Sequence, residues 1–524
     1  MQILQKLGLG LFISTLLLFV LTLSMSNYQL TESVLQEVVT DENHYAVLAP
    51  ELASMLDQEY SSKFSFIADF KGVYNGINEN FKANGEWDKV IWTDYTFNIV
   101  KKSSTGFVTD NVGLLFLLCF VVSSIGALLY IVPQINEGPP GIKNNNIFLH
   151  AATNRGWIGI TVGTALIVFY IFLYKFPEFI TNWVLLLDPL SVALSGNEAS
   201  QWFLYGVMYC LAMTVMGVRM AIKYRHNKYQ LIRTGSVVFF QVAFAFTLPQ
   251  IMSRLHLPSY DLKSAWPLEY TFFFDYRLDE HIQQGTLGVW MLAWGILLFA
   301  VGVPVMTYFF GKRWYCSWVC GCGGLAETLG DPYRHLSDKS VKAWKVERWM
   351  IHSVLVFAIL MTGSVIYAYI SGSTEILGLS TYSIRDNYGF FIGFAFAGVV
   401  GTGFYPLMGN RMWCRFGCPL AAYLGFVQRF KSRFRITTNG GQCISCGNCS
   451  TYCEMGIDVR WYAQRGQNIV RSSCVGCGIC SAVCPRGVLK LENAPNDDAS
   501  RMDAPAIIIG NEGLKLREQV EEVG

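Results

Sequence analysis

Two runs of four cysteines near the end of the chain constrain it most. The first reads C-I-S-C-G-N-C-S-T-Y-C from Cys443 to Cys453, and the second reads C-V-G-C-G-I-C-S-A-V-C-P from Cys474 to Pro485. Each has the spacing C-x2-C-x2-C-x3-C, and the second run lies 31 residues after the first. A cubane iron–sulfur cluster needs four thiolates that converge from different directions, and this spacing supplies them. The duplicated run therefore predicts two 4Fe–4S clusters.

The fourth cysteine of each run is expected to bind the other cluster. The predicted ligands of cluster 1 are Cys443, Cys446, Cys449 and Cys484. Those of cluster 2 are Cys474, Cys477, Cys480 and Cys453. Zinc is the alternative, but zinc sites use two cysteine pairs rather than four cysteines in one run. Cys453 is followed by Glu454, where the second run has Pro485. We expect this departure to alter the properties of the first cluster without removing a ligand.

The rest of the chain has the composition of a polytopic membrane protein. Of its 524 residues 52% are hydrophobic and 15% are charged, against about 25% charged residues in soluble domains. Residues 7–25 form a retained signal anchor, for which a cleaved signal peptide is the alternative. Further apolar stretches are long enough to cross a bilayer. They lie near residues 111–132, 156–175, 201–222, 234–252, 287–310, 349–370 and 390–409. About eight spans are therefore predicted.

Basic residues and cysteines predict the same orientation. With the N-terminus in the cytoplasm, the loops rich in Lys and Arg fall on the cytoplasmic side, as the positive-inside rule requires. Thirteen of the fifteen cysteines then lie on that side, and Cys119 and Cys210 lie within spans. Free thiols and clusters belong in the reducing cytoplasm. We therefore expect an inner-membrane protein with both termini and the cluster module in the cytoplasm.

The predicted domain order follows from these features. It consists of a first span (1–26), a small extracytoplasmic domain (27–108), a membrane domain (109–438), a double-cluster α+β domain (439–492) and a polar tail (493–524). Helices are expected around Thr31–Val39 and Pro50–Phe64. A short strand is expected at Ala506–Gly510. The net charge of +2 gives no indication of nucleic-acid binding.

A second set of cysteines follows two of the predicted spans. Cys316 and Cys320 lie in G-K-R-W-Y-C-S-W-V-C-G, and Cys414 and Cys418 lie in G-N-R-M-W-C-R-F-G-C-P, 98 residues later. If helical, each C-x3-C pair puts both thiols on one face, with Arg313 or Arg411 close by. Three roles stay open: one four-thiolate metal or cluster site, a redox-active dithiol relay, or packed cysteines at helix ends. Cys322 adds a thiol to the first motif only.

These motifs together resemble the membrane polyferredoxin family. Its members include the quinol-dehydrogenase membrane component of periplasmic nitrate reductase systems, the nitrous-oxide-reductase regulatory and maturation protein, and the cytochrome-oxidase accessory protein. The resemblance covers roughly residues 200–490 and is carried by the eight paired-run cysteines and the two C-x3-C motifs. It implies electron transfer between quinone or a cytoplasmic donor and a membrane or periplasmic partner, or support for metalloenzyme assembly. The first motif departs from the family because it ends C-G-C rather than C-P.

Other cofactors have no comparable signal. Residues 27–108 hold no convincing flavin-attachment signature, and no histidines are paired across spans as a membrane haem requires, so neither FMN nor haem is predicted. The sequence thus favours a membrane iron–sulfur electron-transfer component of an oxidoreductase system, with lipid, quinone and redox proteins as partners. An assembly factor that reduces a metal or thiol, and a membrane redox sensor, are the alternatives.

Overall fold

The computed structural model describes residues 2–136, 140–141, 155–257, 261–376, 378–493, 507–510 and 513–516. Contacts divide the chain into two compact units. Unit 1 consists of Met1–Glu137, Val168–Leu211 and Gln250–Leu257. Unit 2 consists of Gly138–Ile167, Ala212–Pro249 and Pro258–Gly524. Helices α9 (Trp157–Lys175) and α12 (Gln201–Lys223) run through both units.

Unit 1 contains a small α/β domain. Its elements are β1 (Asn27–Gln29), α2 (Glu32–Val38), α3 (Glu42–Leu52), β2 (Glu59–Tyr60), α4 (Lys63–Ala83), α5 (Thr96–Lys102), β3 (Ser104–Thr105) and α6 (Phe107–Asp110). The sheet order is β2-β1-β3, and Tyr28, Phe66 and Ile99 are buried in its core. The Thr31 side chain caps α2, which confirms the first predicted helix. The prediction for Pro50–Phe64 is wrong, because this stretch holds the end of α3, a turn and β2.

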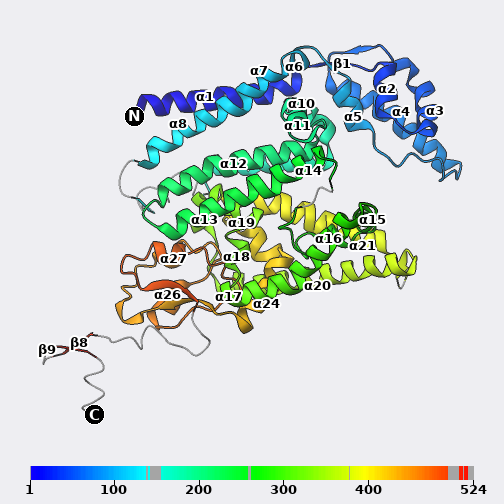
Figure 1. Ribbon diagram of the computed structural model, residues 1–524. Helices are drawn as coiled ribbons and strands as arrows, with labels where there is room; N and C mark the ends of the chain where they lie inside the picture. Colours follow the sequence, from blue (N-terminus) through cyan, green and yellow to red (C-terminus); the bar gives the residue numbers. More distant parts are fainter. Residues whose placement is uncertain are drawn as a thin grey trace. The chain divides into compact units, whose positions relative to one another are not determined.

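The remaining helices of unit 1 pack through small residues. They are α1 (Gln2–Leu21), α7 (Val112–Phe116), η3 (Leu117–Val122), α8 (Ser123–Asn136), α10 (Thr181–Leu185) and α11 (Asp188–Ser195). Helix α1 lies along η3 and α8 (Figure 1). A methyl group at Gly8 would lie 2.8 Å from the carbonyl oxygen of Gly126. The two glycines therefore permit the close backbone approach that is typical of membrane helix pairs.

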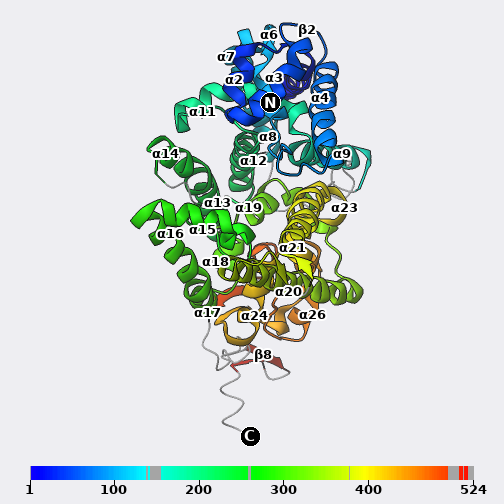
Figure 2. The same cartoon turned by 90° about the vertical axis from the view of Figure 1, so that its right-hand side faces the viewer.

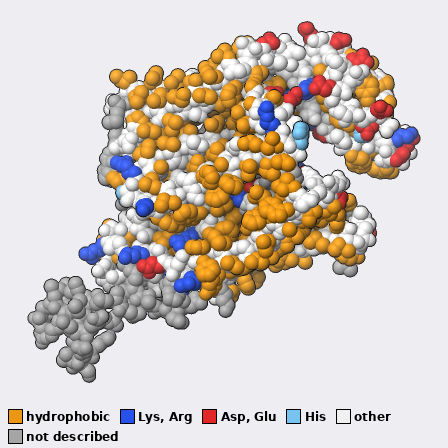
Figure 3. Space-filling view, viewed as in Figure 1, with side chains coloured by type: hydrophobic (Ala, Val, Ile, Leu, Met, Phe, Trp, Pro, Cys, Tyr) orange, Lys and Arg blue, Asp and Glu red, His pale blue; other side chains and the backbone are white. Residues whose placement is uncertain are grey.

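Unit 2 is mostly helical. Its first helices are α13 (Lys228–Phe239), η5 (Phe240–Thr247), α14 (Leu248–Arg254, which ends in unit 1), α15 (Asp275–Gln283), α16 (Gly285–Leu297), η7 (Leu298–Gly302) and α17 (Val303–Phe310). They are followed by α18 (Arg313–Cys316), α19 (Gly321–Thr328), η8 (Asp331–Leu336), α20 (Val341–Ser371), α21 (Thr381–Tyr388), η9 (Gly389–Val400), α22 (Gly401–Gly403), α23 (Tyr405–Met408), η10 (Trp413–Gly417) and α24 (Pro419–Lys431). Hydrophobic side chains cover much of the outer surface of these helices (Figure 3).

Seven helices in the described residues are long and apolar enough to cross a membrane. They are Gln2–Ser24, Val112–Asn136, Trp157–Lys175, Gln201–Lys223, Lys228–Arg254, Gly285–Phe310 and Val341–Ser371. Seven of the eight predicted spans are thus confirmed as candidates. The eighth, 390–409, does not qualify. Its helix is continuous from α21 to α22, but α21 is polar and the apolar part is short, and the chain turns at Phe404.

That eighth helical segment is the returning arm of a hairpin. The strands β4 (Glu375–Ile376) and β5 (Leu379–Ser380) pair antiparallel and connect α20 to α21. Tyr388 packs against Ala358 and Met361 of α20. Near the start of α20, Glu347 accepts a hydrogen bond from Arg415 Nε at 2.6 Å. The chain therefore leaves along α20 and comes back along α21, η9 and α22.

The cluster module of unit 2 is an α+β fold. Strands β6 (Phe434–Thr438) and β7 (Leu489–Asn493) pair antiparallel and enclose the short helices α25 (Asn448–Thr451), α26 (Val459–Gln464) and α27 (Ile479–Ala482). Helices α24 and α26 lie near the start of α20 (Figure 2). Most of the predicted tail lies outside the described residues, but β8 (Ile507–Gly510) matches the expected strand and pairs with β9 (Gly513–Leu516).

Candidate iron–sulfur sites

The cluster 1 site is a small cavity in the cluster module. Cys443, Cys446, Cys449 and Cys484 all line it, together with Arg460, Pro485 and Arg486 among others. The structure therefore brings together the four cysteines that the sequence assigns to one cluster. Gly447 has a φ of 80°, which turns the chain into α25 at a conformation that favours glycine. Cys446 is exposed and Cys449 is buried.

The cluster 2 site is a similar cavity, but its cysteines are all buried or half-buried. Cys453, Cys474, Cys477 and Cys480 line it with Glu454, Val475 and Ile457 among others. The cysteines surround a space, as a cubane requires. In the described part of the chain, no group of three or more His, Cys, Asp or Glu side chains is arranged to hold a single metal ion. The donor set and the cavity in both sites fit a 4Fe–4S cluster.

Side chains from the helices of unit 2 form hydrogen bonds to the loop that surrounds the cluster 2 site. Tyr229 donates to the Gly476 carbonyl and Gln230 to the Cys477 carbonyl, both at 2.8 Å. Gln428 Nε2 donates to the Cys474 carbonyl at 2.9 Å. A methyl group at Gly476 would lie 2.6 Å from the Arg313 Cβ. The backbone carbonyls of the cluster 2 loop thus accept hydrogen bonds from side chains of several membrane-domain elements, and the loop also packs closely against them.

A third cavity unites the two C-x3-C motifs. Cys316, Cys320, Cys414 and Cys418 line it together with Cys322. The sequence repeat therefore forms one five-thiol site, in which Cys322 is exposed and the other four are buried. A hydrogen bond from the Cys322 thiol lowers the pKa of Cys320. This donor set fits a four-thiolate cluster with one additional thiol.

The local geometry corrects the helical interpretation of these motifs. Helix α18 ends at Cys316, and Cys320 is the extended residue before α19. Cys418 likewise precedes α24 in an extended conformation. In each pair the first thiol therefore lies in a short helical segment, and the second lies on the extended residue that precedes the next helix. Gly311 and Gly409 have φ of 66° and 92° and end the preceding helices, which explains the first residue of each motif.

The two arginines of the motifs have different contacts. Arg411 Nη1 lies 3.5 Å from Cys414 Sγ and also donates to the Cys316 carbonyl at 3.3 Å. Arg313 does not reach the thiols. Its Nη2 donates to Asn493 at 2.9 Å, and its guanidinium lies over the Phe434 ring. Only the second motif therefore has the predicted arginine beside a thiol.

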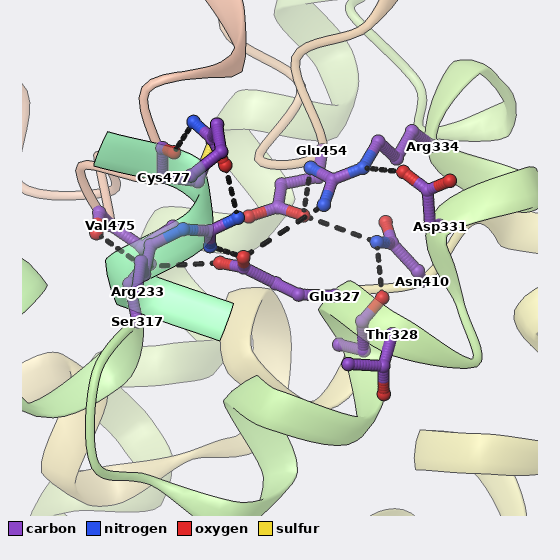
Figure 4. Close-up of polar contacts among 12 residues, drawn as sticks. Arg233, Ser317, Glu327, Thr328, Asp331, Arg334, Asn410, Glu454, Val475 and Cys477 are labelled. Atoms are coloured by element: carbon purple, nitrogen blue, oxygen red, sulfur yellow. Dashed lines mark hydrogen bonds and ion pairs between the residues drawn. The ribbon is translucent and has the colours of Figure 1, made fainter. Parts of the chain in front are cut away.

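A buried network of charges connects the third cavity to the cluster 2 site, and Figure 4 shows the part of it around Glu327, Arg334 and Glu454. Glu454, the residue after Cys453, accepts from Arg334 Nη1 at 2.6 Å, and its Oε1 lies 3.0 Å from Arg411 Nη2. Asn410 Nδ2 also donates to Glu454, at 3.1 Å. Arg411 in turn contacts Cys414. The departure at Glu454 therefore occupies a defined place between the two sites, which sequence reasoning did not anticipate.

The same network extends into the membrane domain. Glu327 pairs with Arg233 and with Arg411, and Asp331 pairs with Arg334 at 2.8 Å. Asp331 also binds Arg219 at 2.8 Å and Lys223 at 2.5 Å. Five cations thus face three carboxylates, which leaves an excess of positive charge. Four thiolates give a cubane cluster a net negative charge, so this excess favours anionic centres on either side of the network.

Burial keeps most of these thiols protonated until iron binds. It raises the pKa of Cys474, Cys477 and Cys316 to about 12, and that of Cys449 also to about 12. Metal ligation requires the thiolate and releases the proton. Although burial also raises the pKa of Glu454, the guanidinium groups of Arg334 and Arg411 lower it to about 2. Glu454 is therefore ionised at neutral pH.

A larger cavity of about 660 Å³ lies beside the third site. Its wall includes Cys414, and module residues Met455 and Ser473 also line it. Trp349, Phe426 and Phe430 line it and are strongly exposed, at 73%, 58% and 61%. Polar groups at the cavity are His352, Arg348, Arg429 and Lys312. The sequence gives no local signal for this cavity, because its lining comes from separate segments of the chain.

The fold and sites define a helical multi-pass membrane protein with ferredoxin-type 4Fe–4S domains. A family model described as a 4Fe-4S binding domain matches residues 292–342 and 388–437. These two ranges contain the two C-x3-C motifs. A second model, described as a 4Fe-4S dicluster domain, matches residues 414–489. The comparisons therefore bear out the predicted two 4Fe–4S clusters and the resemblance to membrane ferredoxin-type proteins.

Two relatives are similar over part of the chain. YccM of Escherichia coli (strain K12) is named as an electron transport protein. It is 29% identical over 162 residues, covering 28% of this chain and 43% of YccM. The methylamine utilization ferredoxin-type protein MauN of Methylobacillus flagellatus is 25% identical over 249 residues, covering 46% of this chain and 81% of MauN. No solved structure matches this chain.

Proposed function

We propose that this chain passes electrons between quinol, or another donor at the membrane, and a redox partner protein. One observation carries the proposal: the five-thiol cavity at the ends of membrane helices is joined by Arg411 and Glu454 to the cluster 2 site. The relatives named for electron transport and as a ferredoxin-type protein support it. When bound, 4Fe–4S clusters supply sites that accept and release single electrons.

The cysteines divide into three ligand sets. Cys443, Cys446, Cys449 and Cys484 hold cluster 1, and Cys474, Cys477, Cys480 and Cys453 hold cluster 2. Cys316, Cys320, Cys414 and Cys418 hold a third cluster, beside which Cys322 is an extra thiol. The shared cavities support these sets. Arg411 fixes the third site by its contacts with Cys414 Sγ and the Cys316 carbonyl.

The 660 Å³ cavity is the proposed quinol site. Its size is that of a small-molecule pocket. Trp349, Phe426 and Phe430 give it an apolar wall suited to an isoprenoid tail, and their exposure suits a cavity open to lipid. His352 and Arg348 offer hydrogen bonds for the oxygens of the head group. Cys414 in the cavity wall puts the proposed site next to the third cluster set.

We further propose an inner-membrane orientation with the module in the cytoplasm. Both C-x3-C motifs meet in one cavity, so the chain between them leaves and returns to the same side. The α21–α22 arm is not among the seven long apolar helices, but we propose that it crosses back beside α20, which makes the number of crossings even. Labelling with an impermeant maleimide tests this, because a cysteine introduced at the exposed Trp87 should react from the side opposite to a cysteine introduced at the exposed Lys490 of the module.

Iron content and EPR test the proposal directly. Anaerobically purified protein should hold about twelve iron atoms per chain if all three sets bind cubanes, and about eight if only the module does. The double variant C316A/C414A should lose about four iron atoms and keep the module signals. Reduction of the remaining clusters by a soluble quinol should then slow strongly. Unchanged iron and unchanged quinol-driven reduction would contradict the third site.

The exposed fifth thiol favours a second candidate, an assembly factor that reduces a metal or a protein thiol. Cys322 has no counterpart in the other motif and lies beside Cys320. Steady-state quinol oxidation discriminates between the candidates. An electron carrier turns over with an artificial acceptor, and C322A should leave that turnover intact. Turnover that is absent in the wild type, together with thiol reduction that C322A abolishes, would favour the assembly factor.

A further inference from the structure

The cluster 1 site opens on a surface that membrane-domain residues leave free. Cys446 is exposed, and Ile444, beside it on the same loop, is 55% exposed. The equivalent residue of the cluster 2 loop, Val475, is only 1% exposed. Cluster 1 is therefore the site that a soluble protein can approach most closely.

The charges on this surface have one sign. Within the described residues 439–493, the exposed charged side chains are Arg460, Arg465, Arg486 and Lys490. The carboxylates of the same stretch are not exposed. Asp458 is half-buried and accepts from Ser450, Glu492 is half-buried and accepts from Thr437, and Glu454 is buried. Lys and Arg side chains likewise predominate on the module in Figure 3.

Basic and apolar side chains lie together at the cluster 1 cavity and on the adjoining helix α26. Arg460 and Arg486 line the cavity. Trp461 is 42% exposed, and the Arg465 guanidinium lies 3.9 Å from the centre of its ring. The exposed Trp461 and the exposed arginines match the composition of protein–protein interfaces, which are enriched in aromatic residues and Arg.

We propose that this face, made of Ile444, Trp461, Arg460, Arg465 and Arg486, docks a small acidic electron-carrier protein over cluster 1. The proposal rests on the proposed electron-transfer function and names the class of its soluble partner. Complementary charge steers the encounter and raises the association rate, and salt screens the effect. Apolar contact with Ile444 and Trp461 then holds the carrier with its redox group close to Cys446.

Two probes of opposite charge test the docking face. The protein is reduced with dithionite, freed of excess reductant, and mixed in a stopped-flow instrument with oxidised flavodoxin, an acidic carrier. Each electron lost by the protein reduces one flavodoxin molecule by one electron. The rate should fall steeply as salt is added. The variant R460Q/R465Q/R486Q should react about tenfold more slowly at low salt and lose most of the salt dependence.

Cytochrome c, a basic carrier, serves as the opposite probe. Its reduction should speed up as salt is added, and the triple variant should reduce it faster than the wild type does. A change in driving force alone would alter both probes in one direction at every salt concentration, so the opposite responses identify the docking charge. The control K342Q/K345Q changes two exposed lysines of α20 and should leave both rates unchanged.

The outcomes separate the two proposals. Equal rates for wild type and triple variant with both probes, at equal iron content, would overturn the docking face. A wild-type protein that holds reduced clusters yet reduces neither probe would overturn the electron-transfer function itself. R486Q alone should give a smaller loss in the same direction, which guards against a folding defect in the triple variant.

Discussion

The two halves of the cluster module share one sequence pattern but have opposite environments. Val475 is 1% exposed and Ile479 is fully buried, whereas Ile444 at the first equivalent position is 55% exposed and Asn448 at the second is partly exposed. Membrane-domain side chains bind the carbonyls of the second loop. The repeat thus gives two sites of equal ligation, of which one is fixed to the membrane domain and the other is left open to solvent.

The residue that follows each cysteine run also differs between the two halves, in both charge and burial. Glu454 follows the first run and lies buried in the charge network, while the equivalent Pro485 is exposed. A cysteine run therefore specifies a cluster, and the residues between and after the cysteines specify what that cluster faces. This comparison explains why an exchange between equivalent positions of the two loops should have unequal effects.

The largest difference is expected for a charge at the first equivalent pair. V475D buries a carboxylate among apolar neighbours without a partner and should lower the free energy of unfolding by about 4 kcal/mol or more. I444D places the same group in solvent and should change it by less than about 0.5 kcal/mol. Thermal unfolding in detergent and iron content measure both. Equal effects would mean that the second loop is not held against the membrane domain.

The next effect is expected at Glu454. E454Q leaves Arg334 and Arg411 without their shared carboxylate and should lower the free energy of unfolding by about 3–5 kcal/mol. Because the folded pKa of Glu454 lies below its ordinary value, this stabilisation is complete above about pH 5 and is lost as the pH falls toward 2. Losing a negative charge beside Cys453 should also raise the reduction potential measured by EPR titration.

The control for Glu454 is the equivalent position of the other half. P485E puts a carboxylate at an exposed site and should leave the unfolding midpoint nearly unchanged. An E454Q protein as stable as the wild type between pH 5 and 8, with the same potentials, would show that the network does not depend on its central carboxylate.

The sequence predicts features that depend on cysteine spacing or on the length and hydropathy of apolar stretches, and most of these features agree with the structure. Ligation depends on cysteine spacing, so both module cavities collect the cysteines expected from the runs. Spans depend on length and hydropathy, so seven helices agree. The eighth predicted span does not meet this measure, because Arg385 and Asp386 lie in the first half of the same helix as the apolar Gly389–Val400.

Long-range contacts have no such signal. Nothing in the local sequence pairs Glu454 with Arg334, 120 residues away, or brings Cys322 to Cys418. A fully helical C-x3-C motif would put both thiols on one face, whereas in the structure glycine turns precede the motifs and extended residues lie within them. The duplication did indicate that both motifs share one role, which is why the four cysteines were found and their geometry was not.

The smallest contrast is expected at the second loop position, where Ser445 and Gly476 both have positive φ, of 59° and 61°. G476A adds a methyl group 2.6 Å from the Arg313 Cβ, and the crowding with the unfavourable backbone should cost about 1–3 kcal/mol. S445A keeps the backbone conformation and loses one exposed hydrogen bond from Gln464, at a cost of about 0.5 kcal/mol. Since Ser445 already has a Cβ at nearly the same φ, the difference between the two variants in thermal unfolding measures the cost of adding a Cβ at Gly476, through both the backbone conformation and the crowding against Arg313. If G476A and S445A shifted the midpoint equally, the Cβ added at Gly476 would have no cost of its own, and the close packing of the cluster 2 loop would not contribute to stability.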